Sequence, residues 1–83
     1  MQIQTPANCA SEKDLYRPTI LNNLGLALQR QFEITQSMDE LNAAIEAASS
    51  ASNCIPENSP GRPGILNNLG TALEIRFEEL YTI

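Results

Sequence analysis

The chain has 83 residues and a formal net charge of −5, from 5 basic and 10 acidic side chains. This length allows one small domain, and a hydrophobic content of 42% is typical of a globular chain rather than a disordered one. The acidic charge repels phosphate, and the sequence has no His, the commonest general base and zinc ligand. We therefore expect no enzymatic activity, no catalytic residue, no metal, no cofactor and no nucleic acid partner.

The chain shows no targeting or membrane segment. Its first residues lack the basic and apolar regions of a secretory signal, and no apolar run approaches the roughly 20 residues that span a bilayer. We expect no membrane partner and a cytoplasmic location, with the nucleus as the alternative. In such a reducing compartment, Cys9 and Cys54 are expected to stay thiols and to pack as small apolar side chains.

An internal repeat is the strongest feature of the sequence. At an offset of 45 residues, 17–33 lie over 62–78 with twelve of seventeen positions identical, including the string Leu-Asn-Asn-Leu-Gly in both copies. Agreement this dense indicates a tandem repeat. We predict a tail over 1–13 that keeps the linker of an earlier unit, a repeat segment over 14–83, a first unit over about 14–58 and a partial second unit over about 59–83.

The first element of each unit reads as an amphipathic helix, here termed helix A. Its apolar residues recur at spacings of three and four: Leu21, Leu24, Leu28 and Phe32. Pro18 falls in the first turn, where its missing N–H costs little. Asp14 or Ser59 is the expected N-cap of each copy. The pattern breaks at Thr35, which predicts the end of the helix.

A second helix, helix B, is predicted to follow. Ser37 and Glu40 have the spacing of a capping box, in which each side chain bonds the other residue's backbone N–H. One face of this helix is apolar: Leu41, Ala44, Ile45 and Ala48. Turn-forming residues over 53–62 predict a linker, after which helix A begins again. The expected fold is all-α, made of tandem antiparallel helix hairpins with three helices in the order A, B, A.

Both copies of helix A carry a mid-helix glycine, Gly25 and Gly70. Glycine costs about 1 kcal/mol against alanine at such a position, so its presence in both copies suggests a packing demand. Without a side chain, the neighbouring helix can approach closely. We expect the alanines of helix B to meet this glycine.

These residues resemble the tetratricopeptide repeat. The resemblance covers residues 14–83 and is carried by Leu21-x2-Leu24-Gly25-x2-Leu28, by Leu41-x3-Ile45 with Ala48, and by a proline after the second helix. Leu stands where that family often has Trp or Tyr, Leu41 stands where it usually has Ala, and the unit is longer than the family's roughly 34 residues. The Leu-Asn-Asn-Leu-Gly string with a long linker is most similar to the kinesin-light-chain-like branch and to fungal arrays found beside CHAT peptidase domains.

The resemblance implies about one and a half repeats of an α-solenoid, in which the A helices line a concave face that binds peptides or a partner helix. The implied function is that of a non-catalytic protein–protein interaction scaffold. Carried over residue by residue, the partner-binding positions are Asn22, Asn23, Leu26, Asn67, Asn68 and Thr71. An Asn amide both donates and accepts hydrogen bonds, which suits the backbone of a bound peptide. For Asn22 and Asn67, solvation or a bridge to the neighbouring repeat is the alternative.

Two other interpretations stay open. The chain could be a fragment of a larger CHAT-peptidase-linked signalling protein whose catalytic domain lies outside it, or a truncated repeat without function. The last helix is apolar on more than one face, which predicts an exposed apolar stripe and self-association. Its apolar residues are Ile65, Leu66, Leu69, Leu73, Ile75, Phe77, Leu80, Tyr81 and Ile83.

Overall fold

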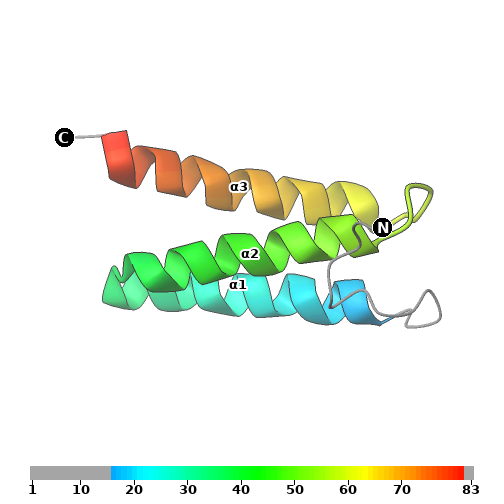
Figure 1. Ribbon diagram of the computed structural model, residues 1–83, viewed down its shortest axis with the longest axis horizontal. Coiled ribbons are helices and arrows are strands. Elements are labelled where there is room, and N and C mark those ends of the chain that lie inside the picture. Colours follow the sequence, from blue (N-terminus) through cyan, green and yellow to red (C-terminus); the bar gives the residue numbers. More distant parts are fainter. Residues whose placement is uncertain (1–15, 82–83) are drawn as a thin grey trace, which may run out of the picture.

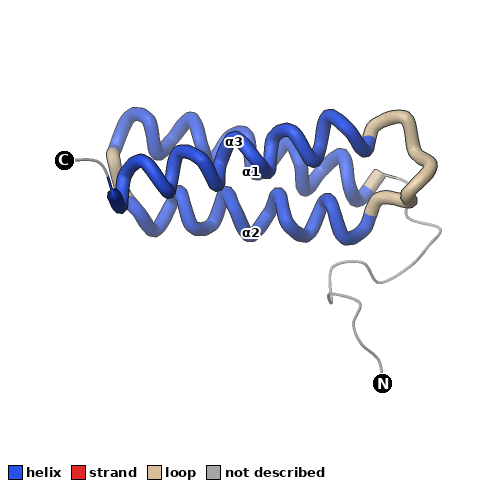
Figure 2. Tube along the Cα trace, turned by 90° about the horizontal axis from the view of Figure 1, so that it is seen from above, coloured by secondary structure: helices blue, strands red, loops and turns tan. Residues whose placement is uncertain are grey.

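The computed structural model describes residues 16–81, which form three α-helices (Figure 1). These are α1 (Arg17–Thr35), α2 (Met38–Cys54) and α3 (Arg62–Tyr81). α1 and α3 run in the same direction and α2 runs opposite to both (Figure 1). Seen from above, α3 lies over α1 with α2 to one side (Figure 2). The predicted all-α class and the order A, B, A are confirmed.

The ends of α1 have clear local causes. Pro18 lies in the first turn, as predicted, and Tyr16 rather than Asp14 occupies the N-cap position; Asp14 lies outside the described residues. At the other end, Gln36 adopts the left-handed conformation with φ 61°, and its backbone N–H donates to the carbonyl oxygen of Phe32 at 2.6 Å. This bond closes the helix after Thr35, where the sequence pattern predicted the break.

α2 begins after Ser37, the predicted N-cap, but the capping box does not form. The Ser37 side chain makes no cap hydrogen bond. Instead, the Thr35 hydroxyl donates to the Glu40 carboxylate at 2.5 Å and accepts the Ser37 backbone N–H at 3.1 Å. The connection between α1 and α2 is only two residues long, so Thr35 lies close to the start of α2. Its hydroxyl therefore bonds both groups that were expected to pair with each other, the Glu40 carboxylate and the Ser37 backbone N–H.

The hydrophobic core consists of two clusters, and each draws residues from all three helices. One contains Phe32, Leu41, Ile45 and Ala72. The other contains Leu21, Ala51 and Ile65, with Cys54 and Ile55 packed against it. The predicted apolar face of α2 is buried throughout. Because four of the buried residues of α2 are alanines, its neighbours can approach its backbone closely.

The close approach predicted at Gly25 is confirmed. A Cβ atom on Gly25 would lie 3.2 Å from the carbonyl oxygen of Ala44, 3.5 Å from the backbone nitrogen of Ala48 and 3.7 Å from the Cβ of Ala47. At Gly70 the same prediction fails: within the described residues, no atom lies within 4 Å of the corresponding position. The glycine is present in both copies of helix A, but residues 16–81 contain a single helix B, α2, and it packs against Gly25 and not against Gly70.

The connection from α2 to α3 spans residues 55–61, shorter than the predicted 53–62 because α2 continues to Cys54. Ser59, expected as an N-cap, lies three residues before α3, and its hydroxyl accepts the Gly61 N–H at 3.3 Å. An Arg62 guanidinium nitrogen donates to the carbonyl oxygens of Ser52 at 2.9 Å and Ile55 at 3.1 Å. The cation therefore sits where the α2 dipole is negative.

Cys54 is disulfide-bonded in the structure, which corrects the expectation of a thiol. That expectation rested on an assumed reducing compartment and not on the geometry of the chain. The other cysteine, Cys9, lies outside the described residues.

Candidate functional site

The predicted partner-binding residues lie on the two A-type helices. α1 carries Asn22, Asn23 and Leu26, and α3 carries Asn67, Asn68 and Thr71. α1 and α3 run in the same direction (Figure 1), so their Leu-Asn-Asn-Leu-Gly strings have the same orientation. We refer to these six residues as the asparagine face.

A hydrogen bond joins the two strings directly. The side-chain nitrogen of Asn68 donates to the side-chain oxygen of Asn22 at 3.0 Å, and both side chains are half-buried. The bond connects unlike positions, since Asn22 is the first asparagine of its copy and Asn68 is the second of its copy. Asn22 therefore bridges to the neighbouring repeat, which was the alternative considered for it. One of the two side-chain N–H groups of Asn68 donates to this bridge.

The other two asparagines are exposed. Asn23 is the repeat equivalent of Asn68, and Asn67 is the equivalent of Asn22. In this chain they present both donors and acceptors at the surface.

The remaining residues of the face differ in character. Thr71 is exposed, and its hydroxyl donates to the backbone carbonyl oxygen of Asn67 at 3.0 Å, which leaves the hydroxyl oxygen able to accept. Leu26 is half-buried on α1. Outside these six residues, α1 also carries an exposed cation, Arg30, and α3 an exposed carboxylate, Glu74. The face combines four amide groups, one hydroxyl and one aliphatic side chain.

Residues 16–81 contain no group of three or more His, Cys, Asp or Glu side chains that could hold a metal ion. Within the same range, each helix is either too short or too polar to cross a membrane.

The Asn22–Asn68 bridge is expected to contribute about 0.5–1.5 kcal/mol to folding, the usual net value of one hydrogen bond. A double-mutant cycle of Asn22→Ala and Asn68→Ala should return a coupling energy in this range from urea unfolding. The cycle is needed because alanine is the better helix former and partly offsets the loss in each single variant. The matched cycle of Asn23→Ala and Asn67→Ala should show no coupling. Equal coupling in both cycles would contradict the bridge.

The predicted apolar stripe on the last helix is confirmed. Leu66, Leu73, Phe77 and Leu80 are all exposed. Ile65 and Ala72 of the same helix are buried against the rest of the molecule. These exposed side chains form a second surface, distinct from the asparagine face. Because of the internal repeat, each of its residues in 62–78 has an equivalent in α1 with which it can be compared.

Known proteins offer no further guide to these two surfaces. No protein-family model, no curated protein and no solved structure matches the chain. The function of the asparagine face is therefore inferred from the internal repeat and from the arrangement of α1 and α3.

Proposed function

We propose that the chain is a non-catalytic protein-interaction module, a tetratricopeptide-like fragment that binds a peptide or a partner helix on the asparagine face. The observation that carries this proposal is the hydrogen bond from Asn68 to Asn22. It holds the two repeated strings side by side and leaves Asn23, Asn67 and Thr71 at the surface.

The chemistry of the face suits a polypeptide backbone. A peptide presents N–H and C=O groups that need partners, and each asparagine amide offers both kinds. Asparagine is a mediocre helix former, so exposed copies in the middle of two helices have a local cost that a binding role explains. The chain's net charge of −5 favours a segment rich in Lys or Arg as the partner.

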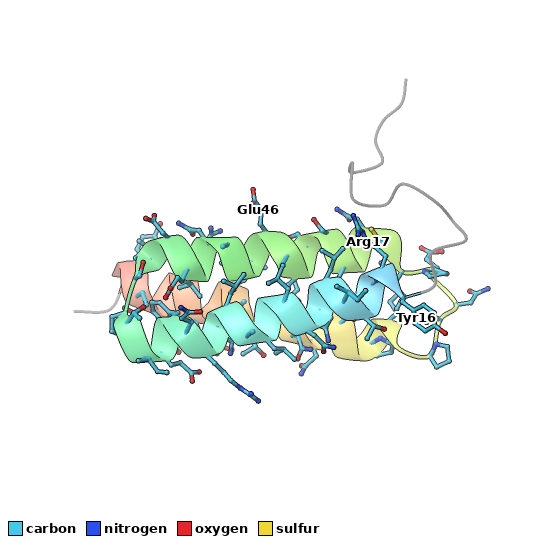
Figure 3. The ribbon with its side chains drawn as sticks, turned by 90° about the horizontal axis from the view of Figure 1, so that it is seen from below. Tyr16, Arg17 and Glu46 are labelled. Carbon is cyan, nitrogen blue, oxygen red and sulfur yellow. The ribbon has the colours of Figure 1, made fainter. Side chains whose placement is uncertain are left out.

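The proposal can be tested with peptides selected from a random displayed library against the immobilised chain. The double variant Asn23→Ala/Asn67→Ala should bind a selected peptide about 30-fold more weakly, because it loses two hydrogen-bonding groups of about 1 kcal/mol each. Isothermal titration calorimetry gives the affinities. A Glu46→Gln variant is the matched control, since Glu46 is exposed and projects from α2 away from α1 (Figure 3).

Three outcomes would contradict the proposal. The library could yield no peptide that binds the chain, the double variant could bind as well as the unaltered chain, or Glu46→Gln could lose as much affinity as the double variant. Circular dichroism of each variant establishes that the helices are intact before binding is compared.

A further inference from the structure

The internal repeat places the same residues in two different surroundings. In α1, Leu21 is 8% exposed and Phe32 is 3% exposed, because both belong to clusters formed with residues of α2 and α3. Their equivalents in α3, Leu66 and Phe77, are 42% and 63% exposed. We call this set the hairpin face. It consists of Leu21, Gly25, Leu28 and Phe32 in α1, and of Leu66, Gly70, Leu73 and Phe77 in α3.

The reverse holds on the adjoining side of the two helices. Ile65 of α3 is 5% exposed because α3 packs this side against the rest of the molecule, whereas its equivalent in α1, Ile20, is 57% exposed. α3 is therefore held in place by one side while its hairpin face stays open. No part of the described chain has to move to uncover that face.

We propose that the hairpin face of α3 docks an amphipathic helix with the residue pattern of α2. The contacts of α1 define that pattern. Small residues must meet Gly70, as Ala44, Ala47 and Ala48 meet Gly25. An aliphatic pair one turn apart must meet Phe77, as Leu41 and Ile45 meet Phe32. The docked helix runs antiparallel to α3, as α2 runs to α1.

The glycine at position 70 favours a helix with small residues over a helix with large side chains on its docking face. The close approach seen at Gly25 exists because backbone and small side chains face a glycine, so a helix with a leucine face would be held away. A second copy of this chain does not offer the required pattern, since its own α1 already covers the alanines of its α2. The surface is also separate from the asparagine face, so the inference stands whether or not that face binds a peptide.

The test uses a synthetic peptide with the sequence of residues 37–54, carrying Cys54→Ser, added to the isotopically labelled full chain. We expect saturable NMR shifts at Leu66, Leu73 and Phe77. Gly70→Leu should weaken binding about tenfold or more, because the added side chain fills the space of the approaching backbone. Phe77→Ser is a second variant on the same face. A peptide of the same composition in scrambled order should not bind.

Several results would overturn the inference. One is the absence of saturable shifts on α3. A second is undiminished binding by the Gly70→Leu chain, with shifts at Leu21 and Phe32, since the peptide would then have replaced the chain's own α2. A third is a stable dimer in sedimentation that buries α3 and that the peptide does not dissociate. The Asn23→Ala/Asn67→Ala chain should bind the peptide normally, which separates this site from the asparagine face.

Discussion

Phe32→Ala is expected to lower the free energy of unfolding by about 3–5 kcal/mol, the usual cost of removing a buried aromatic side chain. Phe32 packs with Leu41, Ile45 and Ala72 in the larger cluster, and it is the only aromatic member of that cluster. A domain of this size has little stability in reserve, so the variant should be largely unfolded at room temperature.

The repeat provides the control for this experiment. Phe77→Ala makes the same change at the equivalent position of α3, where the ring is mostly exposed and contacts Tyr81 at a centroid distance of 4.9 Å. It should cost about 1 kcal/mol or less. Urea unfolding followed by far-UV circular dichroism, at low protein concentration, gives both values. Equal losses at the two positions would mean that α3 is covered in solution as α1 is, contrary to the structure.

Gly25→Leu is expected to destabilise the protein by about 1–3 kcal/mol, because a side chain there must push α2 away from α1. The atoms nearest to the new Cβ are backbone atoms of Ala44 and Ala48, which cannot rotate aside. In a domain this small, each kcal/mol corresponds to roughly 4–8 °C in the melting temperature. Thermal unfolding should show the decrease clearly.

The matched variant at the other glycine should behave in the opposite way. Gly70→Leu introduces its side chain into open space and replaces a poor helix former, which is worth up to about 1 kcal/mol in stability. The melting temperature should therefore stay the same or rise. If Gly25→Leu left the melting temperature unchanged, the close helix–helix contact would be wrong.

Much of the fold follows from local pattern in the sequence. The spacing of the apolar residues, the position of Pro18 and the break at Thr35 located the first helix, and the alanine-rich face of the second helix is buried as expected. These features depend on residues close together in the chain. Their physical causes act within a helix or between a helix and its immediate neighbour.

The details that sequence reasoning missed depend on distances across the molecule. Asn22 bonds Asn68 and not its repeat equivalent Asn67, because the lateral position of α3 against α1 decides which amides meet. The Thr35 hydroxyl bonds the Glu40 carboxylate, so the capping box of Ser37 and Glu40 does not form. This bond also depends on a distance in space, because the two-residue turn brings Thr35 close to Glu40. Neither outcome can be read from residue spacing alone.

The asparagine face was only partly predictable. The repeat identified the six residues and placed them on parallel helices, but it assigned the same role to equivalent positions. The structure divides them instead: Asn22 and Asn68 are half-buried and bonded to each other, and Asn23 and Asn67 are exposed. Identical residues in the two copies therefore have different environments within residues 16–81.

The composition of the two hydrophobic clusters also determines how cooperatively the protein unfolds. Each cluster contains at least one buried residue from every helix, so no pair of helices retains an intact core when the third detaches. Loss of α3 would hydrate both ends of the remaining hairpin at once. Denaturation is therefore expected to be a single all-or-none transition over residues 16–81, without a populated two-helix intermediate.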